Sequence, residues 1–307
     1  MAELAPRISV VLPTHNRAAT LERAVHSVLD QSFADIELIV VDDGSTDGSV
    51  EALAKTIVDP RLRCLRNPAS GGPGAARNLG IAQARADWIA FQDSDDLWLP
   101  HKLQRQWQAH LQHPSWDLVA CDVQAHLLDG TPLKRRPNDF EQLAAKPSEV
   151  LLRPLRFPTP TWLVRRSALA AIGGFDEQMV SAEDWDVCLR LADRGAMGGV
   201  NDCLVHKFES PHSVYGSPGR RHHGTLQIFQ RHPRRWQNPA GREARHHIAV
   251  INARIMMLQG QKAYALRWLL EALRVRPLDP GALMLGLSLI SGKRLDLAWQ
   301  RLRTRPR

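Results

Sequence analysis

The sequence has few of the features that mark disulfide-rich, zinc-binding or membrane-spanning proteins. Its four cysteines are widely separated, and none is paired at the spacing of a metal site. No stretch approaches the roughly 18 apolar residues that span a bilayer, and Gly281 to Ile290 is too short. No charged start precedes an apolar run, so we expect no secretory signal. These absences favour a cytoplasmic protein, with buried free thiols at Cys64, Cys121 and Cys188, which lie in apolar runs.

Acidic residues are scarce in the last third of the chain. From position 201 onward there are 19 Lys and Arg against 6 Asp and Glu, whereas the first 200 residues hold 21 against 26. The net charge of +8 is therefore concentrated in a basic tail. Such a tail can meet nucleic acid, an anionic membrane surface or an acidic substrate. Because chains above about 250 residues usually divide, we expect one main domain and an appendage.

Short apolar segments alternate with helical patterns over the first 125 residues. Strands are predicted at Ile8 to Pro13, Ile36 to Val41, Arg61 to Leu65, Trp88 to Phe91 and Leu118 to Val123. Strands that alternate with helices indicate right-handed crossovers and a mostly parallel sheet. The continuous apolar character of the strands indicates that helices cover both faces. The predicted fold class is therefore α/β and Rossmann-like, with a helical C-terminal extension.

Polar residues follow three of the predicted strands at the point where each strand ends. They are His15-Asn16, Asp42-Asp43 and Asp93-Ser94-Asp95-Asp96. Ligands of parallel α/β sheets bind beyond the carboxyl ends of the strands. We therefore expect the functional site at this edge of the sheet.

The Asp93 to Asp96 cluster carries three carboxylates, which repel one another unless a cation or a hydrogen-bond donor stabilises them. Oxygen ligands suit Mg²⁺ or Mn²⁺, and either ion can bridge carboxylates and a diphosphate. The alternative is that Asp95 or Asp96 caps the helix that follows. By itself the cluster does not decide between the two.

Two further motifs are ambiguous when taken alone. Asp42-Asp43-Gly44-Ser45 is typical of a turn. The segment Gly71 to Asn78 resembles a phosphate loop only loosely, because it lacks the Lys-Ser/Thr ending. Its glycines can equally allow close packing, while Arg77 is well placed for a base or a phosphate.

The order of the motifs along the chain is more specific than any one of them. The motifs are Ile8 to Asn16, Val41 to Asp47, Gly74 to Asn78, Asp93 to Asp96, Gly173 to Glu177 and Glu183 to Trp185. In this order they resemble the family 2 inverting glycosyltransferases of the GT-A fold, of the type that builds bacterial cell-surface polysaccharides. The resemblance covers about Pro6 to His212.

The resemblance implies a donor site for a nucleotide-diphosphate sugar, with a UDP-sugar as the default. The implied nucleotide-binding residues are Thr14, Asn16, Asp42, Asp43, Arg77 and Asp93. Of the two neighbouring acids, Asp43 more than Asp42 is expected at the nucleobase, and Asp93 is expected near the ribose.

The resemblance also implies a Mg²⁺ or Mn²⁺ cofactor and a general base. Asp95, Asp96 and His212 are the implied metal ligands, although a surface role is the default for a histidine. Asp184 is the implied base, with Glu183 and Trp185 on the acceptor side. Outside the family context, Glu183-Asp184 is typical of an exposed first helical turn, where acids favour the helix dipole.

This chemistry predicts a transferase that works by a single displacement. A base takes the proton of the acceptor hydroxyl, and a cation neutralises the departing diphosphate, so the anomeric centre inverts. We expect a glycan or lipid-linked acceptor in surface polysaccharide or glycolipid synthesis, in a bacterial cytoplasm. The alternative is a non-catalytic sugar-nucleotide-binding or scaffold protein.

The domain boundary is predicted near position 215, with a catalytic domain over 1–215 and a basic, mainly helical region over 216–307. Helices are predicted at about Arg242 to Leu258 and Lys262 to Val275. Basic runs occur at Arg220 to His223 and Arg231 to Trp236, but aromatic residues are sparse among them, so no nucleic acid is expected. Peripheral contact with anionic lipid on the inner face of the membrane, a charged acceptor or a merely solvated face remain open.

Overall fold

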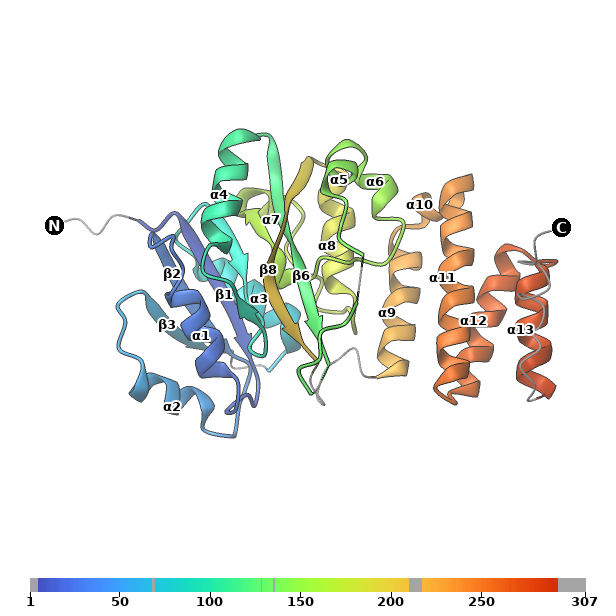
Figure 1. Ribbon diagram of the computed structural model, residues 1–307, viewed down its shortest axis with the longest axis horizontal. Coiled ribbons are helices and arrows are strands. Elements are labelled where there is room, and N and C mark those ends of the chain that lie inside the picture. The colour runs from blue at the N-terminus through green and yellow to red at the C-terminus, as the bar shows by residue number, and fades with distance from the viewer. Residues whose placement is uncertain (1–4, 68–69, 128, 135, 210–216, 292–307) are drawn as a thin grey trace. The chain divides into compact units, whose positions relative to one another are not determined.

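The chain is represented by a computed structural model, shown in Figure 1. The structure describes residues 5–67, 70–127, 129–134, 136–209 and 217–291. The chain divides into two compact units, which we describe separately. The first unit comprises residues 1–151, 155–179 and 183–213, and the second comprises 152–154, 180–182 and 214–307.

An eight-stranded mixed sheet forms the centre of the first unit, in the order β3-β2-β1-β4-β7-β6-β8-β5. The strands are β1 (Ile8–Thr14), β2 (Ile36–Asp42), β3 (Leu62–Arg66), β4 (Trp88–Phe91), β5 (Leu97–Trp98), β6 (Trp116–His126), β7 (Leu163–Arg165) and β8 (Ala196–Phe208). The first four strands along the chain pair in parallel, as do β6 and β8. The remaining pairs are antiparallel. The carboxyl ends of β1, β2 and β4 therefore meet at one edge, as predicted.

Helices cover this sheet on both faces (Figure 1). They are α1 (Leu21–Leu29), α2 (Ser49–Thr56), α3 (Gly72–Gln83), α4 (Lys102–Gln112), α5 (Phe140–Ala145), α6 (Pro147–Val150), α7 (Arg166–Ala171) and α8 (Glu183–Ala192), with a 3₁₀ turn at Thr159–Thr161. Val10 and Leu12 of β1 belong to the same core cluster as α1. Val11 points the other way, where it lies so close to Gly80 of α3 that a Cβ there would come within 2.3 Å of it. Because both faces are packed, all seven residues of β1 are buried.

The sequence pattern predicts the antiparallel half of the sheet less well than the parallel half. The predicted strands do not include the two short strands β5 and β7. Strands of two or three residues carry too little periodicity to be recognised. Their place is fixed by pairing with strands that are distant along the chain.

Helix α3 begins at Gly72, so Gly72 and Gly74 of the segment Gly71 to Asn78 lie inside its first turn and Gly71 is its N-cap. One local expectation needs correction. Cys64 is exposed and not buried. It lies on β3, which forms an edge of the sheet and, among the described residues, pairs with β2 alone.

The second unit is helical in all of its regular described structure. Its helices are α9 (Pro218–Arg231), α10 (Pro233–Gln237), α11 (Pro239–Leu258), α12 (Lys262–Val275) and α13 (Pro280–Ser291). Trp236 and Trp268 are almost fully buried in its core, and the ring of His222 packs edge-on against Trp268 at 4.6 Å. Among the described residues, no helix has both the length and the apolar character needed to cross a bilayer.

Candidate functional site

The turns after β1 and β2 are tied together by side chains of the predicted nucleotide site. Asn16 has a φ of +52°, and its amide oxygen accepts a hydrogen bond from Thr46 N at 2.8 Å. Asp42 Oδ1 accepts from Ser45 N at 2.8 Å. The hydroxyl of Thr14 is buried and has no hydrogen-bond partner within the described part of the chain. Thr14 thus has a polar atom free at the end of β1, where a ligand is expected.

Asp43 links this region to the start of α3. Its Oδ1 accepts from Asn67 Nδ2 at 2.6 Å and from Gly71 N at 3.0 Å. Its Oδ2 accepts from Gly72 N at 2.8 Å. An L-residue at 72 would be strained, since Gly72 has a φ of +86°. The carboxylate therefore caps free N–H groups at the start of a helix and holds the glycine turn in place.

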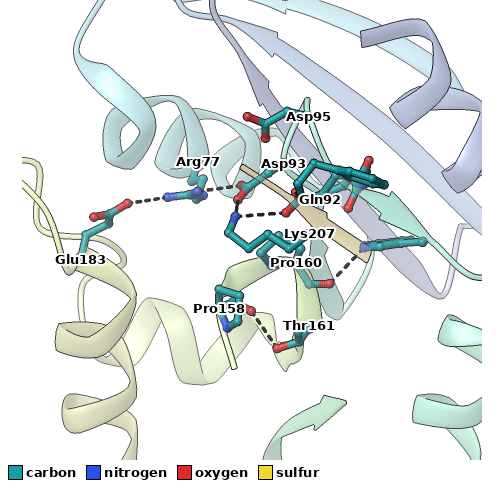
Figure 2. Close-up of polar contacts among 12 residues, drawn as sticks. Arg77, Gln92, Asp93, Asp95, Pro158, Pro160, Thr161, Glu183 and Lys207 are labelled. Carbon is teal, nitrogen blue, oxygen red and sulfur yellow. Dashed lines mark hydrogen bonds and ion pairs between the residues drawn. The ribbon is translucent and has the colours of Figure 1, made fainter. Parts of the chain in front are cut away.

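Arg77 projects from α3 between two carboxylates of the predicted site (Figure 2). Its Nη2 donates to Asp93 Oδ1 at 2.9 Å, and its Nη1 donates to Glu183 Oε1, also at 2.9 Å. The Arg77 side chain is 6% exposed. The structure thus places this guanidinium in an internal bridge, with both terminal nitrogens already in use, although the sequence suggested a nucleotide contact.

Asp93 lies just beyond β4 and has a second positive neighbour, Lys207 of β8. The two groups are 3.5 Å apart (Figure 2). Burial by itself raises the pKa of Asp93, but the charges of Arg77 and Lys207 outweigh it and hold the pKa below its ordinary value. Asp93 is therefore ionised at neutral pH.

Asp96, which also contacts Lys207, is fully buried. One of its carboxylate oxygens accepts from Lys207 Nζ at 3.2 Å, and the other accepts from Phe208 N at 3.0 Å. Burial raises the pKa of Asp96 to about 7. The sequence placed Asp96 among the metal ligands, but its oxygens instead face the interior and fix β8 to the end of β4.

Asp95 is the acid of this cluster that fits a divalent cation. Its carboxylate lies apart from the Arg77–Asp93 bridge (Figure 2), and it pairs with Arg17 at 3.4 Å. Burial and then repulsion from Asp93 raise the pKa of Asp95, so added positive charge at this point is favourable. Within the described residues no three His, Cys, Asp or Glu side chains already form a metal site. His212 lies outside the described residues.

Asp184 lies in the first turn of α8 and is 7% exposed. Its one hydrogen bond among the described residues comes from Trp185 N, at 2.7 Å from Oδ1. Burial, followed by repulsion from Glu183, raises the pKa of Asp184 to about 7. A carboxylate with a pKa near neutrality is suited to accept a proton.

Trp185, expected on the acceptor side, is 3% exposed. Its indole Nε1 donates to Leu151 O at 2.8 Å. The side chain therefore ties α8 to Leu151, and its buried ring is not presented to an acceptor. The neighbouring Glu183 remains partly exposed at 18% of its side chain.

Two residues that hold the site were not singled out by the sequence. Lys207 was missed because a lone lysine carries no motif, and its partners are more than 100 positions away. Asn78 of α3 exchanges hydrogen bonds with the backbone of Phe175, at 2.8 Å in both directions. It ends the Gly74 to Asn78 motif, and this contact explains why that motif accompanies Gly173 to Glu177.

Comparison with known proteins identifies the family. Residues 9–173 match the model of glycosyl transferase family 2, which is more than half of the chain. An uncharacterized glycosyltransferase of Haemophilus influenzae is 33% identical over 166 residues, 50% of this chain and 66% of that protein. A putative teichuronic acid biosynthesis glycosyltransferase of Bacillus subtilis is 35% identical over 137 residues, 44% of this chain and 54% of that protein. The matched segments thus span about half to two thirds of these two relatives.

Solved structures agree on the fold. The first 349 residues of Staphylococcus aureus TarS, crystallised with UDP, give a TM-score of 0.66 at 20% identity, over 96% of this chain and 91% of that one. A mannosyltransferase from Pyrobaculum calidifontis, in complex with GDP-Man and Mn²⁺, gives a TM-score of 0.61 at 21% identity, over 96% and 83%. The expected GT-A fold with added C-terminal helices is confirmed. The chain belongs to glycosyl transferase family 2.

Proposed function

We propose that the chain transfers a sugar from a nucleotide-diphosphate donor to an acceptor hydroxyl, with inversion at the anomeric carbon and assistance from Mg²⁺ or Mn²⁺. The observation that carries the proposal is the position of Asp184. It is a buried acid with a pKa of about 7, and Glu183, which precedes it, is joined through Arg77 to Asp93 beyond β4. Family membership supplies the reaction class.

In the proposed mechanism Asp184 is the general base. It takes the proton of the acceptor hydroxyl as the oxygen attacks the anomeric carbon, while the bond from that carbon to the diphosphate breaks. Base catalysis of this kind contributes about 10²–10⁴-fold to a rate. Because one displacement occurs, the configuration inverts.

The donor is proposed to bind along the ends of β1, β2 and β4. Thr14 would supply a free hydroxyl, Asn16 and Asp42 would shape the turns, and Asp43 is the residue proposed at the nucleobase. Asp95 is the proposed protein ligand of the cation, and His212 stays a predicted second ligand. When bound, the cation supplies positive charge against the departing diphosphate.

The proposed setting is the synthesis of a surface polysaccharide or glycolipid at the cytoplasmic side of a bacterial membrane. The names of two relatives support it, one linked to teichuronic acid and one, from Rhizobium meliloti, to succinoglycan. We propose a UDP-sugar as the donor, which is consistent with TarS structures in complex with UDP and UDP-GlcNAc.

We further propose that residues 1–215 form the catalytic domain and that the basic region 216–307 makes peripheral contact with anionic lipid or a lipid-linked acceptor. Cosedimentation with vesicles that contain anionic lipid should decline as salt is added. Neutral vesicles serve as the control. Equal binding to both kinds would remove the electrostatic argument.

The function is tested by titrating a panel of sugar nucleotides into the protein by calorimetry, with Mn²⁺ and with EDTA. Metal-dependent binding of one donor, followed by its turnover with a glycan or lipid-linked acceptor, is the expected result. If no donor binds in either condition, the chain is not a transferase of this kind.

A further inference from the structure

Arg77 joins three segments of the first unit that are far apart in the sequence. Its guanidinium contacts Asp93 and Glu183 at 2.9 Å each, and it lies 5.4 Å from the centre of the Phe175 ring. A planar guanidinium can make two directed ion pairs at once, whereas a lysine ammonium cannot reproduce that geometry. The bridge therefore sets the direction as well as the distance between the end of β4 and the start of α8.

The start of α8 needs such a support. Ala182, the residue before the helix, has a φ of +62°. This left-handed conformation is unfavourable for alanine and persists only where surrounding contacts enforce it. Glu183, the next residue, is the one that Arg77 holds. The proposed base, Asp184, follows directly, so its position depends on how this turn is held.

We propose that Arg77 is a positioning residue, whose bridge from Asp93 to Glu183 places the Asp184 carboxylate relative to the sugar donor beyond β4. The inference rests on the function proposed above. A base must lie within hydrogen-bond reach of the proton it takes, and a displacement of about 1 Å costs on the order of 10²-fold in rate. Arg77 then acts on the rate of transfer and not on the affinity for the nucleotide.

The experiment compares Arg77→Lys, Glu183→Gln and the double variant with the wild type. The matched control is Arg165→Lys. Arg165 pairs with Asp117 at 3.1 Å, and it lies opposite Trp88, at the start of β4 rather than at its end. For each protein, kcat and donor KM are measured, together with the calorimetric Kd for UDP with Mn²⁺ and the melting temperature.

Each single variant at the bridge should lower kcat by about 10- to 100-fold, with a change in the Kd for UDP of less than about threefold. The double variant should be no slower than the slower single variant, since either change alone breaks the bridge. Arg165→Lys should keep the wild-type kcat.

Three results would overturn the inference. Weaker UDP binding in Arg77→Lys with an unchanged kcat would make Arg77 a nucleotide ligand. Lower melting temperatures with a kcat like that of Arg165→Lys would make the bridge merely structural. Losses in kcat that multiply in the double variant would mean that the two residues act independently. Failure of the proposed function itself looks different, because the wild type would then neither bind nor turn over any donor.

Discussion

Each unit of this chain buries acidic side chains, but it does so in different ways. In the helical unit Glu271 of α12 is 3% exposed, and Arg245 and Arg274 both pair with it. In the α/β unit Asp184 is similarly buried, yet within the described residues it forms no ion pair and accepts a hydrogen bond only from the backbone of Trp185. A compensated buried acid is what a stable core requires. An uncompensated one is a candidate for a functional site.

The same contrast occurs within one helix. Asp186 lies two residues after Asp184 on α8 and is also buried, but Arg190 donates to its carboxylate at 2.8 Å. Because the helix and the burial are shared, the difference between the two acids lies in their partners. This pair offers a direct test of the comparison.

The largest expected effect is at Asp184. Asp184→Asn should lower kcat by about 10²–10⁴-fold, because the amide cannot take the acceptor proton. Donor Kd should stay within about twofold of the wild type, since the site loses no donor contact. The matched variant Asp186→Asn should lower the melting temperature and leave kcat of the folded enzyme near wild type. Equal kcat values for Asp184→Asn and Asp186→Asn would contradict the assignment of Asp184 as the general base.

The next effect is the metal dependence of donor binding. Asp95→Ala should weaken calorimetric donor binding in the presence of Mn²⁺ by at least about tenfold, because it removes the proposed carboxylate ligand. In EDTA the variant and the wild type should bind alike. Asp87→Ala is the control, since the Asp87 side chain is 89% exposed and pairs only at 3.5 Å with Arg166. A variant that keeps full Mn²⁺ dependence would exclude Asp95 as a ligand.

The pH dependence of the transfer rate should follow the protonation of Asp184. Because burial raises the pKa of Asp184 to about 7, the base is increasingly protonated below that pH. The rate at saturating donor should therefore fall about tenfold for each pH unit below 7 and level off above it. A pH–rate profile with donor binding checked at each pH measures this. A profile that is flat between pH 5 and 8 would contradict the assignment.

The smallest expected effect concerns the compensated acid of the helical unit. Glu271→Gln should lower the free energy of unfolding by about 1.5 kcal/mol, at the lower end for a lost charge-assisted hydrogen bond. The freed Arg274 side chain is already 77% exposed, so it returns to water easily. Urea unfolding measures the change, and kcat should not move. A loss of activity here would mean that Glu271 is more than a structural ion pair.

The parallel part of the fold could be predicted because its signal is local. Strand β1 is buried along its whole length, so its residues are apolar on both faces and the run is continuous. The common position of the polar residues that follow β1, β2 and β4 is then predicted from the direction of the strands. The short strands β5 and β7 could not be predicted, because their existence depends on pairing with distant partners.

The sequence alone determined the family, the edge of the sheet where the candidate site lies, and the candidate acids, because motif order and strand ends are properties of the chain. Only the tertiary structure decided which groups each candidate contacts. It set Asp96 against Lys207, left Asp95 outside the Arg77 bridge, and placed Arg77 between Asp93 and Glu183. The physical reason is that charge compensation and burial depend on partners that are far away in the chain, as Lys207 is from Asp93 and Asp96.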